Sequence, residues 1–280
     1  MKNNQNSYSI HSMAKVLKVS PAGFYRWRLR PPSPSDRRRL KVKAAAREIF
    51  FRFKKRYGAP RITKELNEMG IRCSKNYVAA ILYNDGLRAR NGKQFRYSSR
   101  YESRTNLADN LLKRNFKADH PNQKWVTDMT YIWVNGKWLY LVAVMDLYSR
   151  AIVGWSLDTQ QTDELICNAM QMALNNRSVE KGLIVHSDRG VQFRSNRYRK
   201  ILLDNGCRIS MSRKADCWDN AAMEAFFSRL KVELVYAERL NSISQAKTLL
   251  FEYIEIFYNR NRRHSAIGYV SPYKFEKMCA

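Results

Sequence analysis

The sequence predicts an α/β domain that follows basic, all-α modules and precedes a helical tail. Two observations carry this prediction. Residues from Trp125 onward are rich in β-branched and aromatic side chains, whereas the residues before Trp125 favour short helices. Charge divides the chain at about the same place: residues 1–117 hold 29 Lys and Arg against 7 Asp and Glu, and residues 118–280 hold 22 against 17.

Composition narrows the class of protein. The chain has 280 residues, 45% of them hydrophobic, and a formal net charge of +27. No apolar run approaches the roughly 18–20 residues that span a bilayer, and the first residues lack a secretory apolar segment, so we expect a cytoplasmic protein without membrane contact. The five cysteines are dispersed without a C-x-x-C pair, which argues against a zinc site. A first part this basic favours nucleic-acid binding over solubility or attraction to acidic membranes.

Residues 1–30 are typical of a helix-turn-helix module. We expect Ser12 to cap a first helix and Ser20 to cap a second, with Pro21 in its first turn. Arg26 and Arg28 on the second helix are candidate DNA contacts. The alternative is a small helical hairpin that only packs.

Residues 36–90 predict a second helix-turn-helix module after a Pro/Ser linker at 31–35. We expect helices at about 36–56, 61–69 and 75–84, the last capped by Ser74. The last would be the recognition helix, and its first turn offers three candidate contacts to bases and phosphates: Lys75, Asn76 and Tyr77. Residues 91–119 form a basic linker, which either lies along a phosphate backbone or is a disordered spacer.

Residues 120–235 predict the α/β core. Asn135-Gly136 is a two-residue hairpin turn between two strands. The expected elements are strands at 125–134, 137–147 and 151–157, a helix at 162–175, a strand at 183–186, a helix at 196–204, a strand at 208–211 and a helix at 221–234. This βββαβαβα order is that of the ribonuclease-H-like fold.

Three carboxylates lie on separate elements of this core. Asp128 is in the middle of the first strand, where Asp is unfavourable without compensation. Asp188 follows a buried strand, and ligands bind α/β sheets at the carboxyl ends of such strands. Glu224 lies on the last helix, seven residues before Lys231, so both project from one face. Together the three acids predict a site for two Mg²⁺ ions at a phosphodiester, with Mn²⁺ able to substitute.

The sequence blocks WVTDMTYIWV, HSDRGVQF and SRKADCWDNAAMEAFFSRLK resemble the three signature blocks of DDE transposases with a retroviral-integrase-type core. With RYGAPRI and YNRNRRHSAIGYVSP, the whole chain resembles the OrfB product of two-frame bacterial insertion sequences. The resemblance implies a catalytic triad of Asp128, Asp188 and Glu224, with Lys231 as the associated basic residue. Ala215-Asp216 departs from the Gly-Asn found in many members of the family.

The resemblance also implies a function and partners. It implies strand cleavage and strand transfer at terminal inverted repeats, through a circular intermediate, followed by insertion into target DNA. It implies a homo-oligomer on double-stranded DNA in the bacterial nucleoid, and help from an OrfA-type partner protein. Two other functions are open: a DNA-binding repressor with an inert core, and a ribonuclease H or junction nuclease on the same fold.

The remaining polar residues carry weaker expectations. We expect His186 to be packed or hydrogen-bonded rather than a metal ligand, and Arg189 fits either a phosphate contact or a local ion pair. Asp219 or Asn220 is expected to cap the helix of Glu224. In the tail, 236–280, an amphipathic helix at 244–259 should pack on the core or on a partner. The basic residues after it indicate either a DNA clamp or a solvated helix end: Arg260, Arg262 and Arg263.

Overall fold

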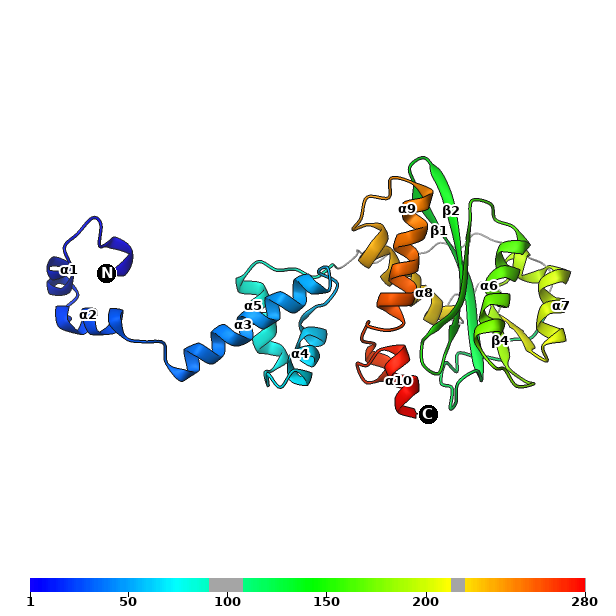
Figure 1. Ribbon diagram of the computed structural model, residues 1–280, viewed down its shortest axis with the longest axis horizontal. Coiled ribbons are helices and arrows are strands. Elements are labelled where there is room, and N and C mark those ends of the chain that lie inside the picture. Colours follow the sequence, from blue (N-terminus) through cyan, green and yellow to red (C-terminus); the bar gives the residue numbers. More distant parts are fainter. Residues whose placement is uncertain (91–107, 213–219, 280) are drawn as a thin grey trace. The chain divides into compact units, whose positions relative to one another are not determined.

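The computed structural model describes residues 1–90, 108–212 and 220–279. It divides the chain into two units, Met1–Arg88 and Ala89–Ala280, coloured from blue to cyan and from cyan to red in Figure 1. Most of the predicted basic linker and the Ala215-Asp216 dipeptide lie outside the described residues. The predicted division into two helix-turn-helix modules, a linker, a core and a tail is finer than these two units and remains a prediction.

The first unit begins with two short helices, α1 (Ile10–Val16) and α2 (Pro21–Leu29), after a 3₁₀ turn η1 (Lys2–Asn4). Ser20 caps α2, as predicted. The prediction for α1 was wrong by one turn: Ser9, not Ser12, is the N-cap, because the Ser9 side chain accepts a hydrogen bond from the Ser12 backbone N–H.

Three further helices follow in the first unit: α3 (Pro34–Arg52), α4 (Ala59–Glu68) and α5 (Lys75–Asn84). Helix α3 begins within the expected linker because Ser33 and Asp36 form a reciprocal capping box around Pro34. Ser74 caps α5, as predicted, by accepting from the Tyr77 N–H at 3.2 Å. The helices share a small core of apolar side chains: Val42, Ala46, Ile49, Phe50, Ile62, Leu66, Val78, Ile81 and Leu82.

The second unit is built on a five-stranded sheet of order β3-β2-β1-β4-β5. The strands are β1 (Lys124–Val134), β2 (Lys137–Asp146), β3 (Ile152–Asp158), β4 (Ile184–Ser187) and β5 (Arg208–Met211). The first three are antiparallel neighbours, whereas β4 and β5 run parallel to β1. Asn135 and Gly136 have φ values of 42° and 84°, as the predicted hairpin turn requires. The ribonuclease-H-like element order is therefore confirmed.

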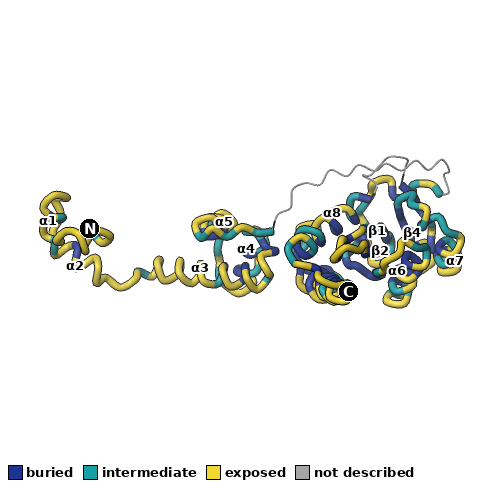
Figure 2. Tube along the Cα trace, turned by 90° about the horizontal axis from the view of Figure 1, so that it is seen from above, coloured by how far each residue is buried: buried dark blue, intermediate teal, exposed yellow. Residues whose placement is uncertain are grey.

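Helices cover both faces of the sheet. Figure 1 shows α6 (Asp163–Asn176) and α7 (Asn196–Asp204) on one side, with α8 (Ala221–Leu230) and α9 (Ile243–Phe251) on the other. Buried residues gather in the sheet between them (Figure 2). Gly154 on β3 lets α6 approach closely, since a Cβ there would lie 2.6 Å from the backbone N of Ala173. A short 3₁₀ turn, η2 (Val191–Arg194), precedes α7.

Two helices change their winding where uninterrupted α-helices were expected. Helix α8 continues as a π-helical segment, η4 (Lys231–Val235), and α9 continues as η5 (Glu252–Tyr258). The chain ends with the 3₁₀ turn η6 (Ser265–Ile267) and α10 (Pro272–Cys279). Within the described residues, no helix combines the length and apolar character needed to cross a bilayer.

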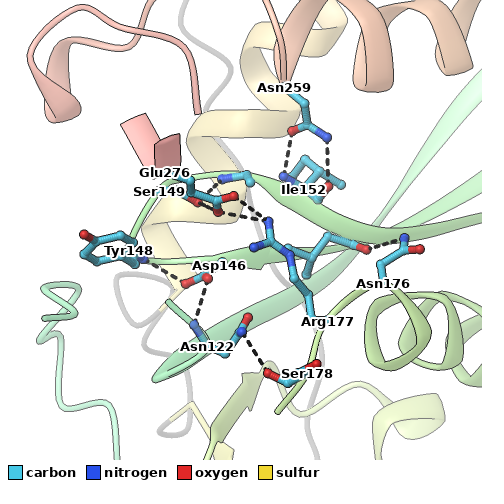
Figure 3. Close-up of polar contacts among 12 residues, drawn as sticks. Asn122, Asp146, Tyr148, Ser149, Ile152, Asn176, Arg177, Ser178, Asn259 and Glu276 are labelled. Atoms are coloured by element: carbon cyan, nitrogen blue, oxygen red, sulfur yellow. Dashed lines mark hydrogen bonds and ion pairs between the residues drawn. The ribbon is translucent and has the colours of Figure 1, made fainter. Parts of the chain in front are cut away.

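The C-terminal tail packs on the core, which resolves one of the alternatives left open by the sequence. Asn259 donates to the carbonyl of Ile152 and accepts from its N–H, both at 2.9 Å (Figure 3). Glu276 on α10 accepts from the Ser149 hydroxyl at 2.6 Å and pairs with Arg177 at 2.9 Å. These bonds connect the tail to the β2–β3 turn and to the end of α6.

Asp146 holds the same end of the sheet together. Its buried carboxylate accepts from the backbone N–H groups of Asn122 and Tyr148, both at 2.9 Å (Figure 3). Burial raises the pKa of Asp146, and the two N–H bonds oppose that rise. The strand pairs Trp125↔Asp146 and Trp125↔Val185 place this network near the start of β1 and β4, away from their carboxyl ends.

Candidate active site

The register of two parallel strands brings Asp128 and Asp188 together. The last paired residues of β1 and β4 are Val126 and His186. Asp128 and Asp188 each lie two residues beyond that pair, so the two aspartates occupy equivalent positions where the strands separate. Side chains at equivalent positions of a parallel pair project to the same face. The strand pairing thus places two carboxylates side by side at the carboxyl end of β4.

Helix α8 adds Glu224 to this edge of the sheet. Asn220, at the start of α8, donates from Nδ2 to the carbonyl of Thr127, the residue before Asp128. The predicted apolar stripe of Met223, Phe226, Phe227 and Leu230 is buried and turns the exposed Glu224 away from the core. Asn220 occupies the N-cap position of α8, one of the two residues expected there, but its side chain makes no capping bond to the helix, and Asp219 lies outside the described residues.

The pKa of Asp128 reports how close the acids are. Burial raises it well above its ordinary value, and the negative charges of Asp188 and Glu224 raise it further. The N–H of Met129, 2.8 Å from Oδ1, and the ammonium group of Lys231 oppose the rise. Asp128 therefore lies within the electrostatic field of Asp188, Glu224 and Lys231.

Asp188 is held by its own loop. Burial raises its pKa, and a hydrogen bond from the Gly190 N–H to Oδ1, at 2.9 Å, opposes the rise. Gly190 has φ of −54°, which any residue adopts, so a sharp turn does not explain the glycine. The glycine is explained by the limited space at this position, because a Cβ on Gly190 would lie 3.0 Å from Asp188 Oδ1 and 3.4 Å from the Phe193 ring.

Lys231 lies at the junction between α8 and η4. Its Nζ is 5.0 Å from the centre of the Tyr131 ring on β1. Burial lowers the pKa of Lys231, and the charge of Asp128 raises it. The helix changes to π-helical winding at Lys231. This change is compatible with the prediction that Lys231 projects from the same face as Glu224.

The chemistry of the acids fits magnesium, although their present arrangement is not a finished metal site. In residues 1–90, 108–212 and 220–279, no group of three His, Cys, Asp or Glu side chains is close enough to hold one ion. Partial desolvation also raises the pKa of Glu224, although its side chain is exposed. A divalent cation would offset the repulsion among the three carboxylates, and hard oxygen donors are what Mg²⁺ prefers. Asn220 Oδ1, buried without a hydrogen-bond partner among the described residues, could accept from a metal-bound water.

The matches to known proteins cover nearly all of the chain. Two models of an integrase core domain match residues 118–217 and 205–272, and a model of an HTH-like domain matches residues 36–95. Transposase InsF for insertion sequence IS3A of Escherichia coli K12 is 42% identical over 275 residues, 98% of this chain and 96% of InsF. An uncharacterized 31 kDa protein of insertion element IS600 from Shigella sonnei is 38% identical over 265 residues, 95% of this chain and 97% of that protein.

The chain belongs to the IS3 family of insertion-sequence transposases.

It is therefore an enzyme of the DDE class with an integrase-type core, and the recognised resemblance is confirmed. Among solved structures, the chain is similar to the catalytic core domain of HTLV-2 integrase in complex with magnesium. That similarity has a TM-score of 0.44 and 16% sequence identity, and covers 57% of this chain and 99% of the other.

His186 has a structural place in the transposase. It is fully buried, with Nδ1 2.8 Å from the Ser210 hydroxyl and Nε2 3.1 Å from the Ser212 hydroxyl. This agrees with the expectation of a packed, hydrogen-bonded histidine. Arg189 also acts locally, since its Nε donates to the Ser212 carbonyl at 2.7 Å. This bond is neither the ion pair nor the phosphate contact that the sequence suggested.

For two of the three basic residues of the tail, the structure contradicts the predicted contact with DNA. Arg262 is 3% exposed and forms a bidentate ion pair with Glu233 on η4, with distances of 2.7 and 2.9 Å. Arg263 is also buried and donates to the Tyr269 carbonyl at 2.9 Å. Neither guanidinium group is accessible to a phosphate, so both leave the set of candidate DNA contacts. Arg260 is exposed and stays in that set.

The candidate contacts of the first unit are accessible. Lys75 and Asn76 are exposed at the start of α5, and Tyr77 is half-buried. Arg26 and Arg28 are exposed on α2, and Arg28 donates to the Gln5 side chain at 3.3 Å.

Sequence analysis missed Glu233 and the bridging role of Asn220. Glu233 lies in a helical segment, and the sequence pattern around it does not distinguish a buried acid from an exposed one. The sequence suggests only a capping role for Asn220, and the one signal for a further role is its place directly before the apolar stripe of α8.

Proposed function

We propose that this transposase binds the terminal inverted repeats of its insertion sequence and catalyses strand cleavage and strand transfer through Asp128, Asp188 and Glu224. The observation that supports it most is the strand register, since Asp128 and Asp188 follow the last β1–β4 pair at equal distance. The rise in the pKa of Asp128 that Asp188 and Glu224 cause supports it further. Both observations support a site in which the three carboxylates share one edge of the sheet.

Asp128, Asp188 and Glu224 would hold two Mg²⁺ ions, or Mn²⁺ in their place. When bound, such ions activate the attacking oxygen and stabilise the leaving oxygen of a phosphodiester. Asp188 influences the pKa of Asp128 more than Glu224 does, so we take the two aspartates as the close pair. The exposed Glu224 side chain would complete the site by a change of rotamer.

The basic residues bind and orient the DNA. Lys231, held between Asp128 and the Tyr131 ring, would contact a phosphate beside the acids. Lys75, Asn76 and Tyr77 begin the proposed recognition helix, and the exposed positions on α2 and in the tail would add phosphate contacts: Arg26, Arg28 and Arg260. Arg189 would approach DNA only with the part of its guanidinium group that does not bond Ser212.

The resemblance to OrfB-type transposases extends the proposal to assembly and location. We propose a homo-oligomer on paired DNA ends, a circular intermediate before insertion into target DNA, and help from an OrfA-type partner. The protein would act in the bacterial cytoplasm, at the nucleoid.

Substitution of Asp188 tests the proposal. Labelled DNA that carries the inverted repeats of the element is incubated with the full chain and Mg²⁺ or Mn²⁺. We expect Asp188→Asn to lower cleavage and joining by at least about a thousandfold, because it removes a catalytic group, while binding of the ends stays near that of the unmodified chain. The matched control is Asp204→Asn, which changes an exposed aspartate at the end of α7 that pairs with Lys200.

Three outcomes would contradict the proposal. Joining by Asp188→Asn at the normal rate would remove Asp188 from the metal site. Binding of the ends without cleavage or joining by the unmodified chain would favour a repressor with an inert core. Preferential cutting of an RNA–DNA hybrid, or of a branched junction, over inverted-repeat DNA would favour a nuclease on the same fold.

A further inference from the structure

A row of exposed aromatic rings lies along the β1–β2 hairpin, farther along β1 than Asp128. Tyr131, Trp133 and Trp138 expose 48%, 54% and 45% of their surface. Their rings touch edge to face: the Tyr131 and Trp138 centroids are 5.1 Å apart, and the Trp133 and Trp138 centroids 4.7 Å. Trp133 and Trp138 are direct partners across the two strands. We call these three rings the hairpin platform.

Cross-strand packing explains the edge contacts of the platform but not its exposure. Such pairs stabilise a hairpin through contact between the two side chains. Here about half of each ring still faces solvent, close to the tip formed by Asn135 and Gly136. Neighbouring exposed aromatic side chains are typical of a binding surface.

Lys231 connects the platform to the acids. Its ammonium group lies over the Tyr131 ring and within the field of Asp128. Alternation along β1 directs Tyr131 and Trp133 to the face opposite Asp128. β4 pairs with β1 only at Lys124–Val126, so β4 does not cover the edge of β1 beyond Val126. A nucleic-acid strand leaving Asp128 would cross that edge beside Lys231.

From these contacts we propose that the hairpin platform stacks unpaired bases of the DNA substrate a few nucleotides from the phosphate that is cut. The proposal rests on the function proposed above. Tyr131 and Trp133 lie three and five residues beyond Asp128, or roughly 10–17 Å along the strand. If the unpaired bases keep a stacked spacing of roughly 3.4 Å, that distance corresponds to about three to five nucleotides of a single strand.

The chemistry selects unpaired bases over other occupants. Aromatic side chains bind the flat faces of bases, and in a duplex these faces are covered by neighbouring base pairs. The cation beside Tyr131 favours a polyanion. A second copy of this chain would instead bring together two molecules that each carry a net charge of +27.

The test compares two labelled duplexes of the same random sequence, one blunt and one with five unpaired thymidines at a 3′ end. Fluorescence anisotropy measures their affinity for the full chain in EDTA, so that metal binding and cleavage do not contribute. We expect the overhang to bind at least about tenfold more tightly, as stacking of one or two bases allows. Asp188→Asn should keep the same preference.

Paired substitutions separate stacking from mere apolar contact. The double variant Trp133→Leu/Trp138→Leu keeps apolar bulk but removes the rings, and it should lose the preference for the overhang. Trp133→Phe/Trp138→Phe should retain most of it. Tyr273→Leu, which changes an exposed ring on α10, should have no effect. Circular dichroism of each variant confirms that the fold is kept.

The outcomes distinguish this inference from the proposed function. Equal affinity for both duplexes, or an unchanged preference in the Leu variant, would overturn the platform even if joining is intact. A preference that the rings control, combined with normal joining by Asp188→Asn, would overturn the proposed function and leave base stacking standing. If light scattering shows that the Leu variant dissociates a dimer while its DNA preference is unchanged, the surface is a self-association interface and the inference is wrong.

Discussion

Asp128 shows how one residue can oppose folding and still define a site. Its carboxylate lies in the middle of a strand, where burial and two like charges raise its pKa. An acid with a raised pKa in the folded state binds its proton more tightly there than in the unfolded chain, so folding disfavours the ionised form. The destabilisation is fully present above the raised pKa and fades as the pH falls towards the ordinary carboxylate value of about 4.

Asp128→Asn should therefore stabilise the metal-free transposase at pH 8 by about 1 kcal/mol, because the amide keeps the shape of the side chain without its charge. The gain should shrink as the pH falls towards 4. Urea unfolding in EDTA at several pH values measures both effects, and Asp204→Asn is the control. A loss of stability at pH 8, or a gain that does not change with pH, would contradict this account.

At the scale of elements, a buried ion pair supports the helix that carries Glu224. Glu233 on η4 is 2% exposed and pairs with Arg262, and the Tyr253 hydroxyl on η5 donates to it at 2.9 Å. Burial lowers the pKa of Arg262, but the hydrogen bonds and charge of Glu233 outweigh burial, so the net shift is upward. Arg90 donates to the Glu233 carbonyl at 2.7 Å. The tail and residue 90 thus meet on the segment that begins at Lys231.

Arg262→Met should destabilise the second unit by about 3–5 kcal/mol, because it leaves the Glu233 carboxylate buried without its cation. Adding Glu233→Gln to Arg262→Met should restore part of the loss. Arg260→Met, a change two residues earlier at an exposed position, should alter stability by less than about 0.5 kcal/mol. Urea denaturation measures all three, and equal stability of Arg262→Met and Arg260→Met would show that the pair has no structural role.

At the scale of the whole molecule, positive charge is concentrated in the first unit. Residues 1–88 hold 21 Lys and Arg against 5 Asp and Glu, a net charge of +16, and residues 89–280 carry the remaining +11. Because phosphate contacts release counterions, each Lys or Arg that touches DNA adds to the salt dependence of binding. Charge alone does not say which residues those are, as the buried Arg262 shows.

Lys231→Ala should weaken DNA binding and lower the magnitude of the slope of log K against log salt by about one, as expected for the loss of one phosphate contact. Lys200→Ala removes the same formal charge from α7, where Lys200 is exposed and paired with Asp204, and should leave the slope nearly unchanged. Anisotropy titrations from about 50 to 200 mM salt give both slopes. Equal slopes for Lys231→Ala and the unmodified chain would exclude a direct phosphate contact by Lys231.

Sequence alone was enough to predict the order of the strands and helices, the hairpin turn at Asn135-Gly136 and the caps at Ser20 and Ser74, and to select the three candidate acids. These features depend on side-chain periodicity and hydrogen bonds between residues a few positions apart, so a short window of sequence contains them. It misplaced the cap of α1 by one turn because Ser9 and Ser12 are equally good caps.

Which distant groups meet depends on packing in three dimensions. The β1–β4 register set Asp128 level with Asp188, and the return of the tail gave Arg262 a partner 29 residues earlier in the chain. The fold also brought Lys231 over Tyr131 beside the acids. Such partners are selected by packing between separate elements. A buried charge is stable only where a group of opposite charge or a hydrogen-bond partner lies beside it, and a local sequence pattern does not identify that partner.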